Sequence, residues 1–244
     1  GLPVTLRSAV KPFSLVALVA SGAADALELS PAELALMAAS HHGEDRHVRT
    51  LIGLFRRLGL VQSQLRCPAA TPLDVSTAAR LARDHEEPGP FRHMCSGFHA
   101  ASLLLARHAG WPLDGYDAPD HPTQVAVRET VARIFRTTPD ALATGMDDCG
   151  LATYAVPLVE VARAYALLAE PATVAGGDPA LVAAVPALTR IRDAMLAAPE
   201  LVGGSTSLDT QLMKRRPGRL VAKGGAEGLR GVGLLAGARG EGAG

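Results

Sequence analysis

Apolar residues recur along most of the chain at the three- and four-residue spacing of helices, and the alternation typical of half-buried strands is scarce. A helix over residues 45–60 places on one face Val48, Leu51, Ile52, Phe55 and Leu58. Similar patterns predict further helices at residues 11–21, 31–37, 76–83, 100–109, 121–135, 157–169, 178–196 and 205–213. The best strand candidate is Arg219 to Ala222. The pattern therefore predicts a helix-rich fold with few strands.

Local signals mark several ends of these helices. Ser30 and Glu33 flank Pro31 in the pattern of a capping box with proline at the first helical position. Asp178 caps the start of the helix over 178–196, which Pro186 is expected to kink or split. Residues 62–92 are weakly patterned and rich in proline, so we expect a surface connection there.

Composition limits the classes of protein that fit. With 244 residues and 48% apolar positions, the chain is large enough for one domain, which we place at 1–230, followed by a flexible Gly/Ala-rich tail at 231–244. Zero formal charge and 4% aromatic residues argue against nucleic-acid binding. No run of eighteen apolar residues and no leader-like segment is present, so we expect a cytoplasmic protein without membrane contact. Three widely spaced cysteines favour reduced thiols.

A Ser-x-x-Lys stretch, Ser8 to Lys11, stands almost at the amino terminus. If the following residues are helical, Ser8 lies at the first turn with Lys11 on the same face, which is the geometry of a Ser-Lys nucleophile pair. The alternative is a helix-capping serine followed by a solvated lysine. Only three of the 24 basic residues are lysines, at positions 11, 214 and 223. Because lysine, unlike arginine, can lose its proton when buried, this scarcity favours the chemical interpretation.

Two later stretches carry a second serine and a second lysine. Ser40 lies in a polar cluster after the helix over 31–37, which is either a turn closed by Gly43 or part of a site. Lys223 precedes two glycines after the best strand candidate. Serine β-lactamases and penicillin-binding proteins carry Ser-x-x-Lys, a serine-containing turn and Lys-x-Gly in this order. A shared site would hold two Ser-Lys pairs, and neighbouring ammonium groups disfavour double protonation.

Two cysteines lie among other reactive groups. Cys95 and His99 are either metal ligands or a buried thiol and a capping imidazole, because one cysteine and one histidine make half a zinc site. Asp147 and Asp148 place two carboxylates beside Cys149 in an expected turn.

Six stretches of the chain together resemble the Ser-Lys type of L-asparaginase, the rhizobial thermolabile family. They are Arg7-Ser8-x-x-Lys11-Pro12-Phe13, Ala39-Ser40-His41-x-Gly43-Glu44, Cys95-Ser96-Gly97-x-His99, Asp120-His121-Pro122-x-Gln124, Asp147-x-Cys149-Gly150 and Lys223-Gly224-Gly225-Ala226-Glu227-Gly228. The resemblance implies an α/β (α+β) fold, a helix-rich domain like that of serine β-lactamases with a small antiparallel sheet.

The resemblance also implies a function, hydrolysis of the side-chain amide of L-asparagine to aspartate and ammonia by a homodimer. Ser8 would attack the amide carbon while Lys11 accepts its proton, and Ser40 with Lys223 would relay protons. The family positions near the substrate are matched by Arg7, His99 and Asp147.

Departures from the family pattern leave alternatives open. Family members hold zinc with a lysine and two cysteines that correspond to Cys95 and Cys149, but Phe98 stands at the lysine position. We therefore expect a weakened, non-essential zinc site. Only seven residues precede Ser8, and a Gly/Ala tail stands where final strands are expected, so the domain is expected to be shortened at both ends. The alternatives are a non-catalytic remnant that serves binding and a penicillin-recognising hydrolase.

Overall fold

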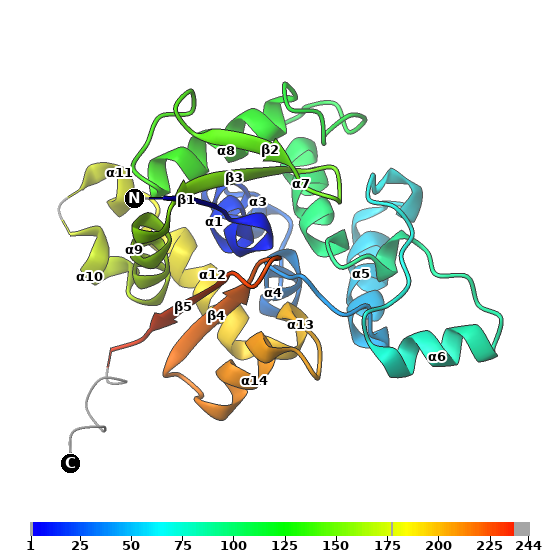
Figure 1. The fold of residues 1–244 in the computed structure, drawn as a ribbon. Helices are drawn as coiled ribbons and strands as arrows, with labels where there is room; N and C mark the ends of the chain where they lie inside the picture. Colours follow the sequence, from blue (N-terminus) through cyan, green and yellow to red (C-terminus); the bar gives the residue numbers. More distant parts are fainter. Residues whose placement is uncertain (1, 177, 237–244) are drawn as a thin grey trace, which may run out of the picture.

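The computed structural model describes residues 2–176 and 178–236. Helices pack around a buried amino-terminal segment, with one small antiparallel sheet above it and a second one below it in the view of Figure 1. That segment consists of the 3₁₀ helix η1 (Arg7–Val10) and the helices α1 (Lys11–Ser14) and α2 (Val16–Ala20). Ser8 to Val19 are all buried, so this segment forms the centre of the core and fixes Ser8 and Lys11 inside it.

The other helices surround this centre. They are α3 (Ala23–Ala26), α4 (Pro31–Met37), α5 (Asp45–Leu58), α6 (Val75–Arg83), α7 (Ser96–His108), α8 (Pro122–Ile134), α9 (Leu158–Ala169), α10 (Pro171–Ala175), α11 (Pro179–Val182), α12 (Val185–Ala197), α13 (Pro199–Val202) and α14 (Leu208–Arg215), with 3₁₀ turns η2 (Gln62–Gln64) and η3 (Pro90–Arg92). The capping box of α4 is confirmed. The helix predicted over 178–196 is split into α11 and α12, with Pro186 in the first turn of α12.

The strands form two sheets where one was expected. In the first, β1 (Pro3–Thr5) and β2 (Ala143–Met146) both pair antiparallel with β3 (Ala152–Pro157), in the order β1-β3-β2. In the second, β4 (Leu220–Gly224) pairs antiparallel with β5 (Arg230–Leu234). Apart from β4 these strands escaped the sequence analysis, although β3 is longer than β4 and β5 has the same length. All four residues of β2 are exposed, so the strand leaves no apolar alternation to detect.

The tail predicted to begin at Gly231 starts instead as strand β5, and this corrects the sequence interpretation. Two of its glycines are needed for packing. A Cβ at Gly231 would overlap the ring of Tyr165, and one at Gly233 would overlap the Tyr165 carbonyl oxygen. The glycines therefore let β5 lie flat against α9, which explains why a strand here reads as a low-complexity tail. The rest of the predicted tail, 237–244, lies outside the described residues.

Another glycine of the sequence motifs has a packing role. Helix α7 begins at Ser96, four residues earlier than predicted, and Gly97 lies against α4, where a Cβ would overlap the carbonyl oxygen of Leu36. The close contact of α7 with α4 brings Cys95 beside the loop that carries Ser40. In the part of the chain that the structure describes, no helix has the length and apolar character needed to cross a bilayer.

Candidate active site

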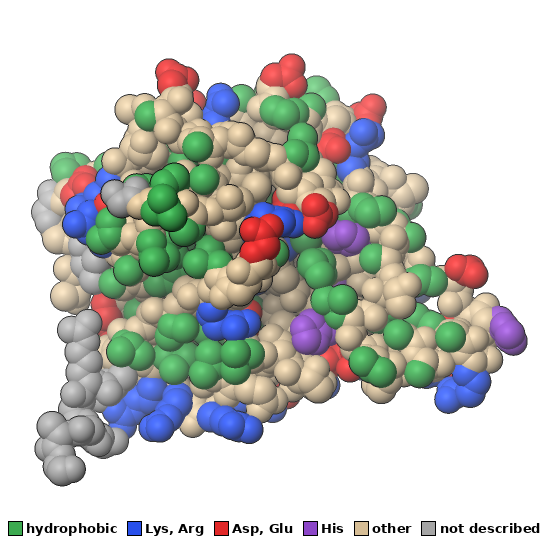
Figure 2. All heavy atoms as spheres, viewed as in Figure 1, with side chains coloured by type: hydrophobic (Ala, Val, Ile, Leu, Met, Phe, Trp, Pro, Cys, Tyr) green, Lys and Arg blue, Asp and Glu red, His purple; other side chains and the backbone are tan. Residues whose placement is uncertain are grey.

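The residues selected from three distant sequence stretches meet in one pocket. Its volume is about 430 Å³, within the range of small-molecule sites, and its lining includes Ser8, Ser40 and Lys223. Lys11 lies beneath the lining, with 2% of its surface exposed. On the molecular surface, charged groups of both signs gather at the centre of the face, where the two sheets approach each other (Figure 2). The fold therefore places both Ser-Lys pairs at a single site.

Ser40 connects the two lysines. Lys11 Nζ donates to Ser40 Oγ at 3.1 Å, and Lys223 Nζ donates to the same oxygen at 3.0 Å. Lys11 Nζ is also bound by the carbonyl oxygen of Ala39 at 2.9 Å, and Lys223 Nζ by that of Gly224 at 2.5 Å. Because both lysines donate to it, the two lone pairs of the Ser40 hydroxyl oxygen are occupied. Ser40 Oγ thus bridges the two lysines.

Ser8 differs from Ser40 in having an uncommitted hydroxyl. It lies in η1 and lines the pocket with 9% of its surface exposed, and its Oγ makes no hydrogen bond to any described residue. The preceding residue, Arg7, has a φ of 46°, in the left-handed region where a side chain strains the backbone. Tyr165 Oη donates to the carbonyl oxygens of Ala9 (2.8 Å) and Lys223 (3.2 Å), which ties η1 to β4. Ser8 therefore lies in the pocket on a segment tied to β4, with a hydroxyl that makes no hydrogen bond to a described residue.

Burial changes the protonation of the second lysine. Lys223 is 1% exposed, and burial lowers its pKa to about 7, with the nearby charge of Asp209 opposing the shift and that of Lys11 adding to it. A substantial fraction of Lys223 is therefore neutral near pH 7, and a neutral amine can accept a proton from the Ser40 hydroxyl.

The loop that carries Ser40 is held by backbone and imidazole contacts. The N–H groups of Ser40 and His42 donate to the carbonyl oxygens of Val202 (3.1 Å) and Gly203 (2.9 Å). His41 is fully buried between Ser96 Oγ, 2.9 Å from its Nε2, and the Gly43 N–H, which donates to its Nδ1 at 3.1 Å. Burial holds the pKa of His41 well below its ordinary value, so the ring stays neutral in this structural role.

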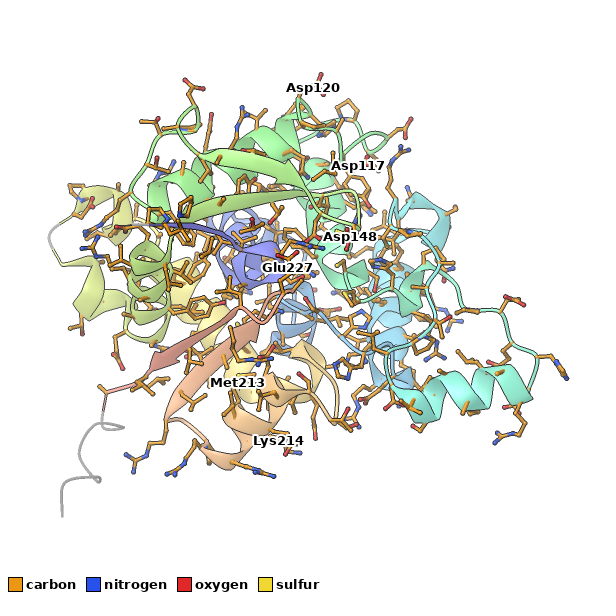
Figure 3. The ribbon with its side chains drawn as sticks, in the orientation of Figure 1. Asp117, Asp120, Asp148, Met213, Lys214 and Glu227 are labelled. Atoms are coloured by element: carbon orange, nitrogen blue, oxygen red, sulfur yellow. The ribbon has the colours of Figure 1, made fainter. Side chains whose placement is uncertain are left out.

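Arg7 and Asp147 belong to a charged cluster at the mouth of the pocket. Arg7 Nε donates to Asp147 Oδ1 at 2.7 Å, Nη1 to Glu227 Oε1 at 3.0 Å and Nη2 to Asp148 Oδ2 at 2.7 Å. The hydrogen bond to Asp147 is the main cause of a raised Arg7 pKa. Figure 3 shows Asp148 and Glu227 next to each other, although one follows β2 and the other lies in the turn between β4 and β5. One guanidinium against three carboxylates leaves this cluster with excess negative charge.

His99 lies behind the pocket instead of lining it. Its ring is fully buried and Nδ1 is 2.8 Å from Tyr116 Oη. Burial lowers its pKa to about 4, so the imidazole is neutral. The geometry therefore does not support the predicted direct substrate contact, and His99 shapes the wall beside Cys95.

The thiols of Cys95 and Cys149 lie close to each other, and that of Cys95 contacts Lys11. Cys95 Sγ accepts from Lys11 Nζ at 3.1 Å. The hydrogen bond from Cys149, followed by the charge of Lys11, holds the pKa of Cys95 well below its ordinary value, and the same bond raises that of Cys149. Of the two sulfur atoms, that of Cys95 is therefore the one that favours the thiolate form, and it is the one that contacts Lys11 Nζ.

The described residues around Cys95 and Cys149 provide too few ligands for a zinc ion. Phe98 is buried in α7 with its ring centroid 5.7 Å from Lys11 Nζ, where it supplies no donor atom. Within residues 2–176 and 178–236, no group of three or more His, Cys, Asp or Glu residues is arranged to hold a metal. Stable zinc sites in proteins use three or four ligands, and the two thiols provide only two. The zinc site implied by the family resemblance thus stays a prediction without structural support.

We expect the purified chain to retain less than about 0.1 zinc per molecule after dialysis, because two protein ligands bind too weakly. Elemental analysis measures this directly. Phe98→His, which adds a nitrogen ligand one helical turn after Cys95, should raise the zinc content, and Phe91→His, at a buried site outside this cluster, should not. One tightly held zinc in the unchanged chain would contradict the prediction.

Three residues that support the site were missed in the sequence. Asp209 Oδ2 accepts from the Gly224 N–H at 2.7 Å, Arg230 Nε donates to Asp209 Oδ1 at 2.7 Å, and Tyr165 joins η1 to β4. The signal for Arg230 was the stretch Gly224 to Gly228, whose glycines indicate a hairpin that returns the chain beside Lys223. Asp209 and Tyr165 carried no local signal.

A free serine hydroxyl beside two buried lysines that share a second serine is the arrangement of a hydrolase with a serine nucleophile and a lysine base. The family model of L-asparaginase II matches residues 1–243, and the chain belongs to the L-asparaginase II family. Membership implies hydrolysis of the asparagine amide, and the family prediction made from the six motifs is confirmed. A comparison with curated proteins gave no match.

Proposed function

We propose that this protein hydrolyses the side-chain amide of L-asparagine through a covalent ester on Ser8. The observation that carries the proposal is the Lys11–Ser40–Lys223 hydrogen-bond chain beside the free hydroxyl of Ser8. Family membership supplies the substrate class. The order of the three motifs also supports a single domain with a fold related to serine β-lactamases. The homodimer is proposed from the family resemblance alone.

The first half of the reaction forms the ester. Ser40 passes its proton to neutral Lys223 and receives one from Lys11, which leaves Lys11 neutral. Ser8 Oγ then bonds to the amide carbon while its proton moves to Lys11. When the carbon–nitrogen bond breaks, the leaving nitrogen takes that proton and departs as ammonia.

The second half consumes water. A water molecule attacks the ester carbon, a neutral lysine accepts its proton, and the ester oxygen recovers a proton as Ser8 is released. Two backbone N–H groups suit the oxyanion that forms in both halves. Ser8 and Ala226 line the pocket, and neither N–H donates a hydrogen bond to a described residue. A Cβ at the neighbouring Gly225 would lie 2.6 Å from the Leu6 carbonyl oxygen, so β4 ends directly against η1.

The charged groups of the substrate have partners at the pocket mouth. The excess of carboxylates around Arg7, with Asp147 12% exposed, suits the α-ammonium group of an amino acid. Arg7 in this proposal positions the carboxylates. His99 contributes indirectly through the wall that it forms with Cys95. Zinc takes no part in these steps.

The test is release of ammonia and L-aspartate in equal amounts from L-asparagine by the purified chain, followed by mass spectrometry of rapidly quenched enzyme. We expect turnover and an aspartyl adduct on the peptide that contains Ser8. Absence of both products in a sample that unfolds cooperatively would favour the non-catalytic alternative, and labelling of Ser8 by a β-lactam would favour the penicillin-recognising one.

The rate should depend on pH through Lys223. Because the neutral form accepts the proton and its pKa is about 7, kcat/KM should rise as the pH increases through about 7 and fall tenfold per unit below it. Initial rates between pH 5 and 9 measure this. Replacing the exposed Lys214 by methionine should leave the rise in place, since that lysine pairs with Glu200 away from the pocket. A flat profile across this range would contradict the assignment.

A further inference from the structure

We infer that Arg230 binds the α-carboxylate of the substrate, so that the enzyme selects amides with a free carboxylate beside the amino group. The inference rests on the proposed function and names a residue that determines specificity. It comes from the arrangement of charges around the pocket, in which Arg230 differs from the other arginines.

Arg230 is held beside the reacting groups by the sheet. It is the first residue of β5 and pairs in register with Gly224, the residue after Lys223. Its side chain lines the pocket and is 33% exposed. A Cβ at Gly224 would lie 2.8 Å from Arg230 Nη2, so the guanidinium lies against the backbone of Gly224.

Asp209 fixes the orientation of this guanidinium. The carboxylate is 6% exposed, and its two oxygens accept from Arg230 Nε and from the Gly224 N–H, both at 2.7 Å. The contact with Asp209 engages only Nε of the Arg230 guanidinium. Among the described residues, Nη1 and Nη2 find no acceptor. These two nitrogens form the planar fork that matches a carboxylate.

The other arginines of the pocket lining are committed elsewhere. All three side-chain nitrogens of Arg7 bind carboxylates. Arg92 donates to the carbonyl oxygen of Gly43 at 2.7 Å and pairs with Asp45 at 2.7 Å. Among the lining arginines that the structure describes, Arg230 alone keeps its terminal nitrogens for a ligand.

The pocket therefore has negative charge at the Arg7 cluster and positive charge at Arg230, which complements the two charged groups of an α-amino acid. The carboxylate-rich cluster suits the ammonium group, and Arg230 suits the carboxylate. Both groups are attached to one carbon, and Glu227 of the cluster lies three residues from Arg230 in the same hairpin (Figure 3). The hairpin between β4 and β5 can therefore contact both ends of the amino-acid group while Lys223 serves the amide.

The first experiment compares two amides in wild type and Arg230→Gln. L-asparagine has the α-carboxylate, and 3-aminopropanamide has the same reacting amide and amino group without it. We expect KM for L-asparagine to rise about 10- to 100-fold with kcat changed less than about threefold, and kcat/KM for 3-aminopropanamide to stay within about twofold. Equal losses with both amides, or no loss with either, would overturn the inference.

Control variants separate binding from folding. Arg216→Gln removes the same charge from an exposed position and should behave as wild type in both assays. Arg230→Lys keeps a charge beside Asp209 but lacks the fork, so its KM for L-asparagine should lie between wild type and Arg230→Gln. If Arg230→Gln fails to unfold cooperatively, this lysine variant carries the test.

A binding experiment separates this inference from the proposed function. Calorimetry with L-aspartate and with 3-aminopropanoate, which lacks the α-carboxylate, needs no turnover. In one outcome, wild type releases no ammonia and still binds L-aspartate, with at least about tenfold weaker binding in Arg230→Gln. That result would contradict the proposed hydrolysis and support the carboxylate site. Unchanged L-aspartate affinity in the variant, or no binding by wild type, would overturn the inference.

Discussion

Ser8→Ala is expected to lower the rate of ammonia release from L-asparagine by about 10³- to 10⁵-fold, because it removes the atom that bonds to the amide carbon. The thermal unfolding midpoint should change little, since Ser8 Oγ makes no hydrogen bond to a described residue. Initial-rate assays and a thermal melt measure the two effects.

Two serine variants serve as comparisons for Ser8. Ser40→Ala should lose about 10²- to 10³-fold, because it interrupts proton transfer but leaves the nucleophile in place. Ser14→Ala removes a buried hydroxyl that has no partner among the described residues and should keep wild-type activity. A Ser40→Ala loss greater than that of Ser8→Ala would transfer the role of nucleophile to Ser40.

Lys223→Met is expected to lower kcat by about 10³-fold and to abolish the rise in rate near pH 7, because it removes the group whose pKa is about 7. Stability should not fall, since methionine fills a similar volume without a buried charge. Chemical denaturation measures the free energy of unfolding beside the pH–rate profile.

The matched control for this variant is Lys214→Met. Lys214 lies on α14, is 50% exposed and pairs only with Glu200 among the described residues (Figure 3). It should keep both the rate and the pH profile. An unfolded Lys223→Met protein would show that the ammonium holds β4 in place, and a pH profile that keeps its rise would assign the titration to another group.

Most helices could be predicted from the sequence because they depend on local information. The capping box of α4, the αL glycine at the end of α5 and Pro186 in the first turn of α12 are all signals within a few residues of the feature that they control. The strands of the first sheet could not be predicted from local sequence. β1 pairs with β3, which lies more than a hundred residues later in the chain, and β1, β2 and β3 have no alternation of apolar and polar residues.

For the candidate site, the sequence indicated the residues but not the contacts among them. Lysine scarcity and motif order selected Ser8, Lys11, Ser40 and Lys223 without structural information. The sequence could not give the connections among them, because the bond from Lys11 to Ser40 joins residues 29 positions apart and the one from Lys223 to Ser40 spans 183.

The sequence by itself determined the family and most helices and selected the candidate catalytic residues, since each is written in short motifs and local spacing. Only the tertiary structure decided that Ser40 bridges both lysines, that Arg7 is occupied by carboxylates and that the terminal nitrogens of Arg230 have no acceptor among the described residues. Hydrogen bonding, burial and charge at a site depend on distances between segments remote in the chain, which no local pattern encodes.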